Sequence, residues 1–248
     1  MLAKGGVALE LRLARARTTR DVDVRLAGMS SEVLVRLQAA GRRDLGDFLT
    51  FRVQEPSGEV LMEGDGIIYE GRRFRAEALL GGERYGDLFG LDVAVGDALT
   101  GEVDVMEGSR LLGFIGVAPS RIRLYPRETH LAEKFHAYTL PRERENSRVK
   151  DLPDMALLGQ SGPFEARLLR TALQRTFDFR RTHFLPKLVP EPPVSWSVPY
   201  ARMARDNDLP WKSLEGVTLA VRAFLGPLLS GGDGTWAPEA WVWRTPGG

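Results

Sequence analysis

The chain has 248 residues, of which 43% are hydrophobic and 27% charged, and its formal net charge is +1, values typical of a globular protein with one large domain or two small ones. It has no cysteine, which excludes disulfides, thiolate zinc sites and cysteine nucleophiles. It also lacks an apolar run of about eighteen residues and a secretory leader, so we expect no membrane partner and a cytoplasmic location.

A glycine pair comes first along the chain. Gly5 and Gly6 follow Lys4 and open an apolar run over residues 7–13 that is typical of a short helix. Glycines at a helix start allow backbone N–H groups and the positive helix end to approach a phosphate closely. This segment therefore predicts a phosphate-binding turn.

An alternating strand follows at residues 21–24. Because side chains alternate faces along a strand, Asp21 and Asp23 share one face, while the two valines between and after them point towards a core. Two neighbouring carboxylates favour a cation between them, and Mg²⁺, a hard cation with oxygen ligands, suits such a site. The strand predicts a metal site, with a solvated edge strand after a turn as the alternative.

The hydrophobic period changes after the next predicted helix, which Ser30 and Ser31 cap and Gly41 ends. Strands are predicted at 49–53, 66–69, 74–80 and 88–95, with turns at 56–58, 70–71 and 81–82. These short connections favour a largely antiparallel sheet.

Asp92 is a lone carboxylate inside an apolar predicted strand, where an ionised group without a partner would be costly. We expect it to be a third carboxylate that accepts a proton from an attacking hydroxyl or shares the metal. Asp97 and Asp104 are rival candidates, and an acid that simply faces a turn is the alternative.

From Pro119 onwards the pattern becomes helical. A helix is predicted at 128–140 and another contains Asp151 and Asp154, one turn apart. Later helices are predicted at 163–175, 199–205 and 213–228, with a proline-rich connector at 186–199. Residues 229–248 contain glycines and tryptophans and are predicted to form a flexible tail, with docking on the body of the protein or on a partner as the alternative.

Charge is distributed unevenly along the chain. Residues 44–107 contain five basic and fifteen acidic residues, and residues 119–187 contain fourteen basic and eight acidic residues. The pattern predicts an acidic, metal-bearing half and a basic half that meets a polyanion, or else solvated faces that merely differ.

Several motifs in one order support a family resemblance. They are residues 4–6, the strand at 21–24, and the segments 127–137, 148–154 and 176–181. Together they resemble the abortive-infection AbiEii/AbiGii nucleotidyltransferase toxins of the polymerase-β-like superfamily. The resemblance implies an α+β fold, with a nucleotidyltransferase domain at 1–118 that contains a mixed, largely antiparallel sheet, and a helical domain at 119–228. The active cleft would lie between them.

The resemblance also implies roles for particular residues. Asp21 and Asp23 would hold Mg²⁺, Lys134 would contact the nucleotide phosphates, and Asp151 would complete the site. Lys4, Gly5 and Gly6 would bind the nucleotide, and Asp154 is an additional catalytic candidate. The alternatives are an ordinary surface lysine at Lys134 and a helix-surface ion pair between Lys150 and Asp154. His136 is expected to pack, or to support a site residue from behind, rather than to catalyse.

The function implied by the resemblance is transfer of a nucleotide from a nucleoside triphosphate to RNA, at the tRNA 3′ end, which blocks translation. A cognate antitoxin would be the protein partner. Superfamily members often have Gly-Ser where this chain has Gly5-Gly6, so backbone N–H groups must replace a hydroxyl. The chain begins almost at this motif, so an upstream segment is missing or the protein is a short form. The alternatives are a truncated, non-catalytic RNA- or protein-binding module and transfer onto a protein hydroxyl.

Overall fold

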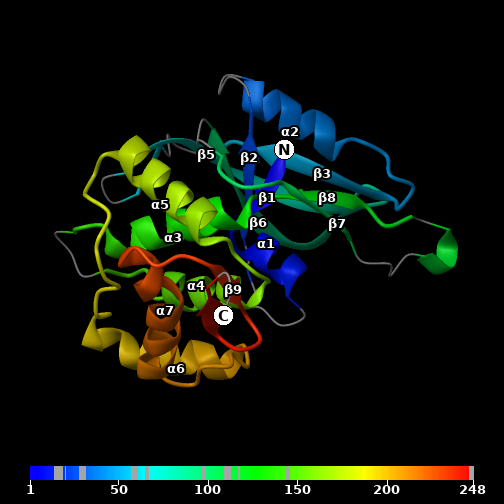
Figure 1. Ribbon diagram of the computed structural model, residues 1–248. Coiled ribbons are helices and arrows are strands. Elements are labelled where there is room, and N and C mark those ends of the chain that lie inside the picture. Colours follow the sequence, from blue (N-terminus) through cyan, green and yellow to red (C-terminus); the bar gives the residue numbers. More distant parts are fainter. Residues whose placement is uncertain are drawn as a thin grey trace. The chain divides into compact units, whose positions relative to one another are not determined.

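The computed structural model describes residues 1–13, 19, 21–27, 32–56, 61–64, 67–95, 99–108, 113–116, 118–142 and 146–245. The chain forms two compact units. Unit 1 comprises Met1–Leu11, Thr19–Asp97 and Val103–Tyr125, and unit 2 comprises Arg12–Thr18, Ala98–Glu102 and Pro126–Gly248. Unit 1 contains the large sheet, and unit 2 is mostly helical (Figure 1).

The sheet of unit 1 is mixed and largely antiparallel, as the sequence predicts. Its strands are β1 (Leu2–Lys4), β2 (Asp21–Leu26), β3 (Leu49–Gln54), β4 (Leu61–Gly64), β5 (Ile67–Leu80), β6 (Glu83–Val95), β7 (Asp104–Glu107) and β8 (Arg121–Leu124). The strand order is β3-β5-β6-β2-β1-β8-β7, with β4 paired to β5. β2 runs parallel to β6 and β1 runs parallel to β8, whereas the other pairs are antiparallel. With the helices, this makes the chain α+β.

Strand β5 is longer than the sequence predicts. The turn predicted at residues 70–71 is wrong, because β5 continues through Gly71, which pairs with Ala94 of β6. The next residue, Arg72, pairs with Leu61 of β4, so the backbone on both sides of β5 is engaged here. The last strand, β8, lies past residue 118, where we expected the first domain to end.

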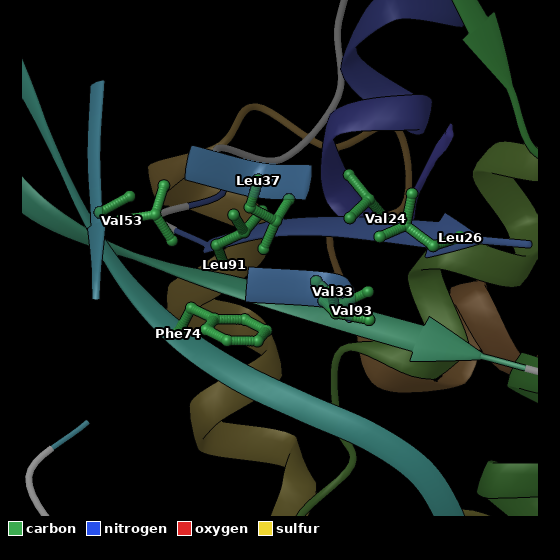
Figure 2. Close-up of a cluster of buried hydrophobic side chains, with 9 residues drawn as sticks. Val24, Leu26, Val33, Leu37, Val53, Phe74, Leu91 and Val93 are labelled. Atoms are coloured by element: carbon green, nitrogen blue, oxygen red, sulfur yellow. The ribbon is translucent and has the colours of Figure 1, made fainter. Parts of the chain in front are cut away.

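One face of the sheet carries the hydrophobic core of unit 1. The helix α2 (Val33–Gly41) ends at the predicted glycine and turns Val33 and Leu37, one helical turn apart, towards the strands. Figure 2 shows these side chains gathered between α2 and the central strands. The buried cluster is Val24, Leu26, Val33, Leu37, Val53, Phe74, Ala76, Leu91 and Val93. The predicted caps Ser30 and Ser31 lie outside the described residues.

The helices of unit 2 are α3 (Arg127–Thr139), α4 (Asp151–Gln160), α5 (Ala166–Arg180), α6 (Ser197–Asp206) and α7 (Leu214–Leu229). Two of the predicted helices have clear end signals: Pro141 closely follows the end of α3, and the Ser213 hydroxyl caps α7 by accepting from the Gly216 N–H. Helix α5 runs further than predicted, to Arg180, and its C-cap Arg181 adopts a left-handed conformation with a φ of 51°. Within the described part of the chain, no helix has the length and apolar character that crossing a membrane requires.

The C-terminal residues, where we expected a flexible tail, form a hairpin of β9 (Thr235–Ala237) and β10 (Val242–Arg244) in unit 2. Trp236 is fully buried, with its ring centroid 4.6 Å from that of Phe224, and its indole N–H donates to the Gly159 carbonyl. Trp241 and Trp243 also donate to helix α7 carbonyls. Burial of aromatic surface with satisfied indole N–H groups explains why this segment is folded.

Candidate active site

The acidic face of unit 1 lies opposite the core cluster. Asp21 and Asp23 project from β2 on one face, and the parallel register pairs Asp23 with Asp92 of β6. Residues paired in register share a face of the sheet, so the two predicted metal ligands and the predicted third carboxylate lie on the same face. The structure thus brings Asp92 beside the Asp-x-Asp pair.

The rival carboxylates do not join this face. Asp97 lies outside the described residues. Asp104 is on the edge strand β7 and pairs with Leu124, which pairs with Ala3, which in turn pairs with Val24. Asp104 therefore points to the face opposite Asp23.

A row of four charged residues crosses four adjacent strands. Lys4 of β1 pairs with Asp23, Asp23 pairs with Asp92, and Asp92 pairs with Arg73 of β5. Two cations thus flank two carboxylates on one face. The Lys4 ammonium also lies over the Tyr125 ring, 4.9 Å from its centroid.

Arg73 is a site residue that the sequence analysis missed. Its Nε and Nη2 donate to the two oxygens of Asp92 at 2.7 and 2.6 Å, a bidentate pair that fixes the orientation of the carboxylate. The hydrogen bonds to Asp92, followed by the charges of Asp92, Asp21 and Asp23, raise the pKa of Arg73 above its usual value despite partial burial. The alternation of β5 could have placed Arg73 on the acidic face, but not opposite Asp92.

Gly5 makes the closest backbone approach to this carboxylate face. It starts helix α1 (Gly5–Arg12) with a φ of 62°, a conformation that favours glycine. A Cβ at this position would lie 1.9 Å from Oδ2 of Asp23. Glycine at position 5 is therefore what allows the start of α1 to sit directly against the second aspartate.

Two further glycines keep the surroundings compact. A Cβ on Gly6 would lie 2.6 Å from Cβ of Thr19, and a Cβ on Gly90 would lie 2.5 Å from Oδ1 of Asp21. The Thr19 hydroxyl donates to the Asp21 carbonyl and its N–H donates to the Glu10 carboxylate, which ties the end of α1 to the start of β2. The sequence analysis used Gly6 but missed Thr19 and Gly90.

The donor set suits a metal ion that shares its ligands with a substrate. Among the described residues, no three His, Asp or Glu side chains form a cluster able to hold a metal ion. Asp21 and Asp23 supply two carboxylates, and both oxygens of Asp92 accept from Arg73. Mg²⁺ in phosphoryl-transfer sites is held by one or two carboxylates together with substrate phosphates and water. The residues present therefore fit Mg²⁺ bound with a triphosphate, not a closed metal cage.

The predicted residues of the helical half come together within unit 2. The Lys134 ammonium of α3 lies 2.7 Å from Oδ2 of Asp154 and 3.2 Å from Oδ1 of Asp151, both on α4. The side chains are 12%, 0% and 8% exposed, respectively. Lys134 is thus a largely buried cation held by two carboxylates, and not an ordinary surface lysine.

His136, also on α3, has the packing environment that we expected. Its Nδ1 and Nε2 lie 3.3 Å from Arg180 and 2.8 Å from the Thr182 hydroxyl, and its ring packs edge-on against Phe177. Burial, with a smaller contribution from His183, lowers the pKa of His136 to about 4, although Glu133 opposes the shift. Burial likewise lowers the pKa of Arg180 to about 9. A neutral imidazole that accepts from or donates to its neighbours is a structural group.

The comparisons with known proteins agree with these motifs. A family model described as "Nucleotidyl transferase AbiEii toxin, Type IV TA system" matches residues 3–228. A search of curated proteins gives no match.

Proposed function

The chain belongs to the AbiEii family of nucleotidyl transferase toxins from type IV toxin–antitoxin systems, and from this premise we propose that it transfers a nucleotide from a nucleoside triphosphate to an RNA acceptor. The proposed acceptor is the 3′ end of tRNA, whose modification would block translation. We assign the reaction to a polymerase-β-like domain at 1–118, followed by a helical domain at 119–228.

The observation that supports this proposal best is the contact between the glycine turn and the second aspartate. A Cβ on Gly5 would overlap the Asp23 carboxylate, so a side chain at this position would have to displace the second aspartate. Backbone N–H groups at the start of α1 can then bind phosphate oxygens next to a carboxylate that binds their counter-cation. A structural turn alone has no need for this proximity.

Asp21 and Asp23 would hold the Mg²⁺ ion. When bound, it would neutralise the triphosphate and stabilise the charge that develops on the leaving pyrophosphate. The start of α1, with Gly5 and Gly6, would orient the triphosphate against this face, and Lys4 would add positive charge from the neighbouring strand.

In the proposed reaction, the acceptor hydroxyl oxygen attacks the α-phosphorus in line. The new bond joins the acceptor oxygen to phosphorus, the bond to the β-bridging oxygen breaks, and pyrophosphate leaves with that electron pair. Asp92 would accept the hydroxyl proton, and Arg73 would keep its carboxylate pointing the same way throughout.

Residues of the helical half also have roles in the proposed reaction. Lys134 would contact the nucleotide phosphates, with Asp151 and the additional candidate Asp154 as its partners. Residues 119–187, with fourteen basic and eight acidic side chains, would meet the RNA backbone. A cognate antitoxin would be the protein partner.

The test is incubation of the protein with Mg²⁺, total cellular RNA and each α-labelled nucleoside triphosphate in turn. Asp21→Asn should abolish labelling while leaving the fold intact by circular dichroism. Asp87→Asn is the matched control, because Asp87 is an exposed aspartate of β6 that lies before the residues paired with β2. Labelling of a small RNA by wild type and Asp87→Asn alone supports the proposal. Label on protein would change the acceptor, and labelling by Asp21→Asn would refute the assignment.

A further inference from the structure

Two aromatic rings at the end of α5 are exposed to an unusual degree. The Phe184 side chain is 96% exposed and that of Phe179 is 57% exposed. Phe177 of the same segment is buried against Phe135 and His136, so the segment does have a core-facing side. The outward rings are therefore not needed for packing within the described structure.

Hydrogen bonds to helix α3 and within the turn fix the residues just before Phe184. The Thr182 hydroxyl lies 2.8 Å from Nε2 of His136 and 3.0 Å from Nδ1 of His183. His183 in turn has its Nε2 2.8 Å from the Thr139 hydroxyl on α3. Arg181, which precedes Thr182, has a left-handed backbone conformation and caps α5. The exposed ring of Phe184 thus follows a fixed hydrogen-bonded turn.

Basic residues are close to these two rings in the sequence. Arg175, Arg181 and Lys187 are exposed, and none forms an ion pair with an acidic side chain of the described residues. Between residues 175 and 187 there are four cations and one anion, Asp178. Because Arg175 and Phe179 are four residues apart on a helix, a cation and a ring share one side of α5.

We propose that this surface, made of Arg175, Phe179, Arg181, Phe184 and Lys187 and called here the α5 platform, stacks unpaired nucleotides of the RNA acceptor. The proposal rests on the proposed function for its choice of RNA as the substrate class. Each nucleotide of a single strand offers a base that can stack and one phosphate charge. The α5 platform offers exposed rings together with cations that have no carboxylate partner among the described residues. Charge complementarity therefore favours RNA over a purely apolar protein surface.

The first experiment measures binding of a short fluorescein-labelled single-stranded RNA by anisotropy, without Mg²⁺ or nucleotide. Phe184→Ala should weaken binding by about five- to 150-fold, the effect expected for loss of one stacked base. Phe184→Trp should keep wild-type affinity because it keeps a stacking face. Leu219→Ala, a change at an exposed apolar residue of α7, is the matched control and should have no effect.

The salt dependence separates stacking from phosphate contact. Lys187→Gln should reduce the slope of log K against log salt concentration by about 0.7, the value for one phosphate contact on a single strand. Phe184→Ala should lower the affinity without changing that slope. Lys212→Gln is the charge-matched control, because its ammonium already pairs with Asp208 at 2.6 Å.

Each outcome has a defined consequence. An unchanged RNA affinity in Phe184→Ala overturns the proposal. If the molar mass of this variant, measured by light scattering, changes while its RNA affinity does not, the rings are a self-association surface and the proposal is again overturned. RNA binding that depends on Phe184 without any transfer would refute the proposed function alone. Transfer by a protein whose RNA binding ignores Phe184 would refute the platform alone.

Discussion

The buried ion pairs of Lys134 allow its structural and catalytic roles to be separated. Lys134→Met keeps the length of the side chain but removes the charge that faces Asp151 and Asp154, whose side chains are 8% and 0% exposed. Removing one partner of a buried pair leaves an uncompensated charge and costs about 3–5 kcal/mol. We therefore expect Lys134→Met to lower the free energy of unfolding by about that amount.

A double variant tests the cause of this loss. Lys134→Met with Asp154→Leu removes both members of the closest pair, and apolar replacement of a buried pair is often neutral or stabilising. Part of the lost stability should return, because Asp154 is no longer a buried charge without a partner, whereas Asp151 still lacks the ammonium. Transfer activity should not return, because no ammonium is left to contact the nucleotide phosphates.

The assay is urea unfolding followed by tryptophan fluorescence, together with the labelled-nucleotide transfer assay. Lys212→Met is the matched control: its pair with Asp208 has side chains 61% and 66% exposed, so it should cost less than about 1 kcal/mol. A Lys134→Met protein within about 1 kcal/mol of wild type would refute the argument from burial. Transfer by the double variant would refute a catalytic role for Lys134.

Three more changes have definite expected outcomes. Gly5→Ala should lower kcat/KM about 100-fold because its Cβ displaces the neighbouring carboxylate, whereas Gly46→Ala, which has a φ of 76° and no atom within 4 Å of its added Cβ, should keep wild-type activity. Arg73→Gln should lower kcat about 10- to 100-fold with an unchanged KM for nucleotide, because Arg73 acts through Asp92. Arg73→Lys should have an intermediate kcat. A change in KM as large as the change in kcat would argue against this role. Because His136 has a folded pKa of about 4 and an ordinary value of 6.5, its stabilising contribution is complete above pH 6.5 and is lost as pH falls towards 4. Urea unfolding over this range should show a loss on the order of 3 kcal/mol larger in wild type than in His136→Gln, and parallel curves would exclude His136 as the cause.

The sequence predicted the local parts of the candidate site well. The period of two at residues 21–24 placed both aspartates on one face, and the apolar strand around Asp92 marked it as unusual. Both inferences need only the geometry of one strand, which neighbouring residues determine. The expected tail differed because its stability depends on Trp236 meeting Phe224 and Gly159, which are distant in sequence.

The partner of Asp92 shows what sequence alone determined and what only the tertiary structure decided. The alternation of β5 and β6 assigns each residue to a face. Next to the turn between β5 and β6, Leu80 pairs with Glu83. If this register continued along both strands, Asp92 would lie opposite Gly71. An irregularity near Gly86, which has a φ of 76°, shifts the register by two residues and places Arg73 there instead.

That shift also pairs Phe74 with Leu91 inside the core, where Phe74 is fully buried. A face is a property of one strand, so the sequence could supply it. A register is chosen by the burial energy of side chains from different strands, together with a bulge that glycine tolerates. For the same reason, the motifs could name Lys134, Asp151 and Asp154, but only the packing of α3 against α4 could make them one buried ionic group.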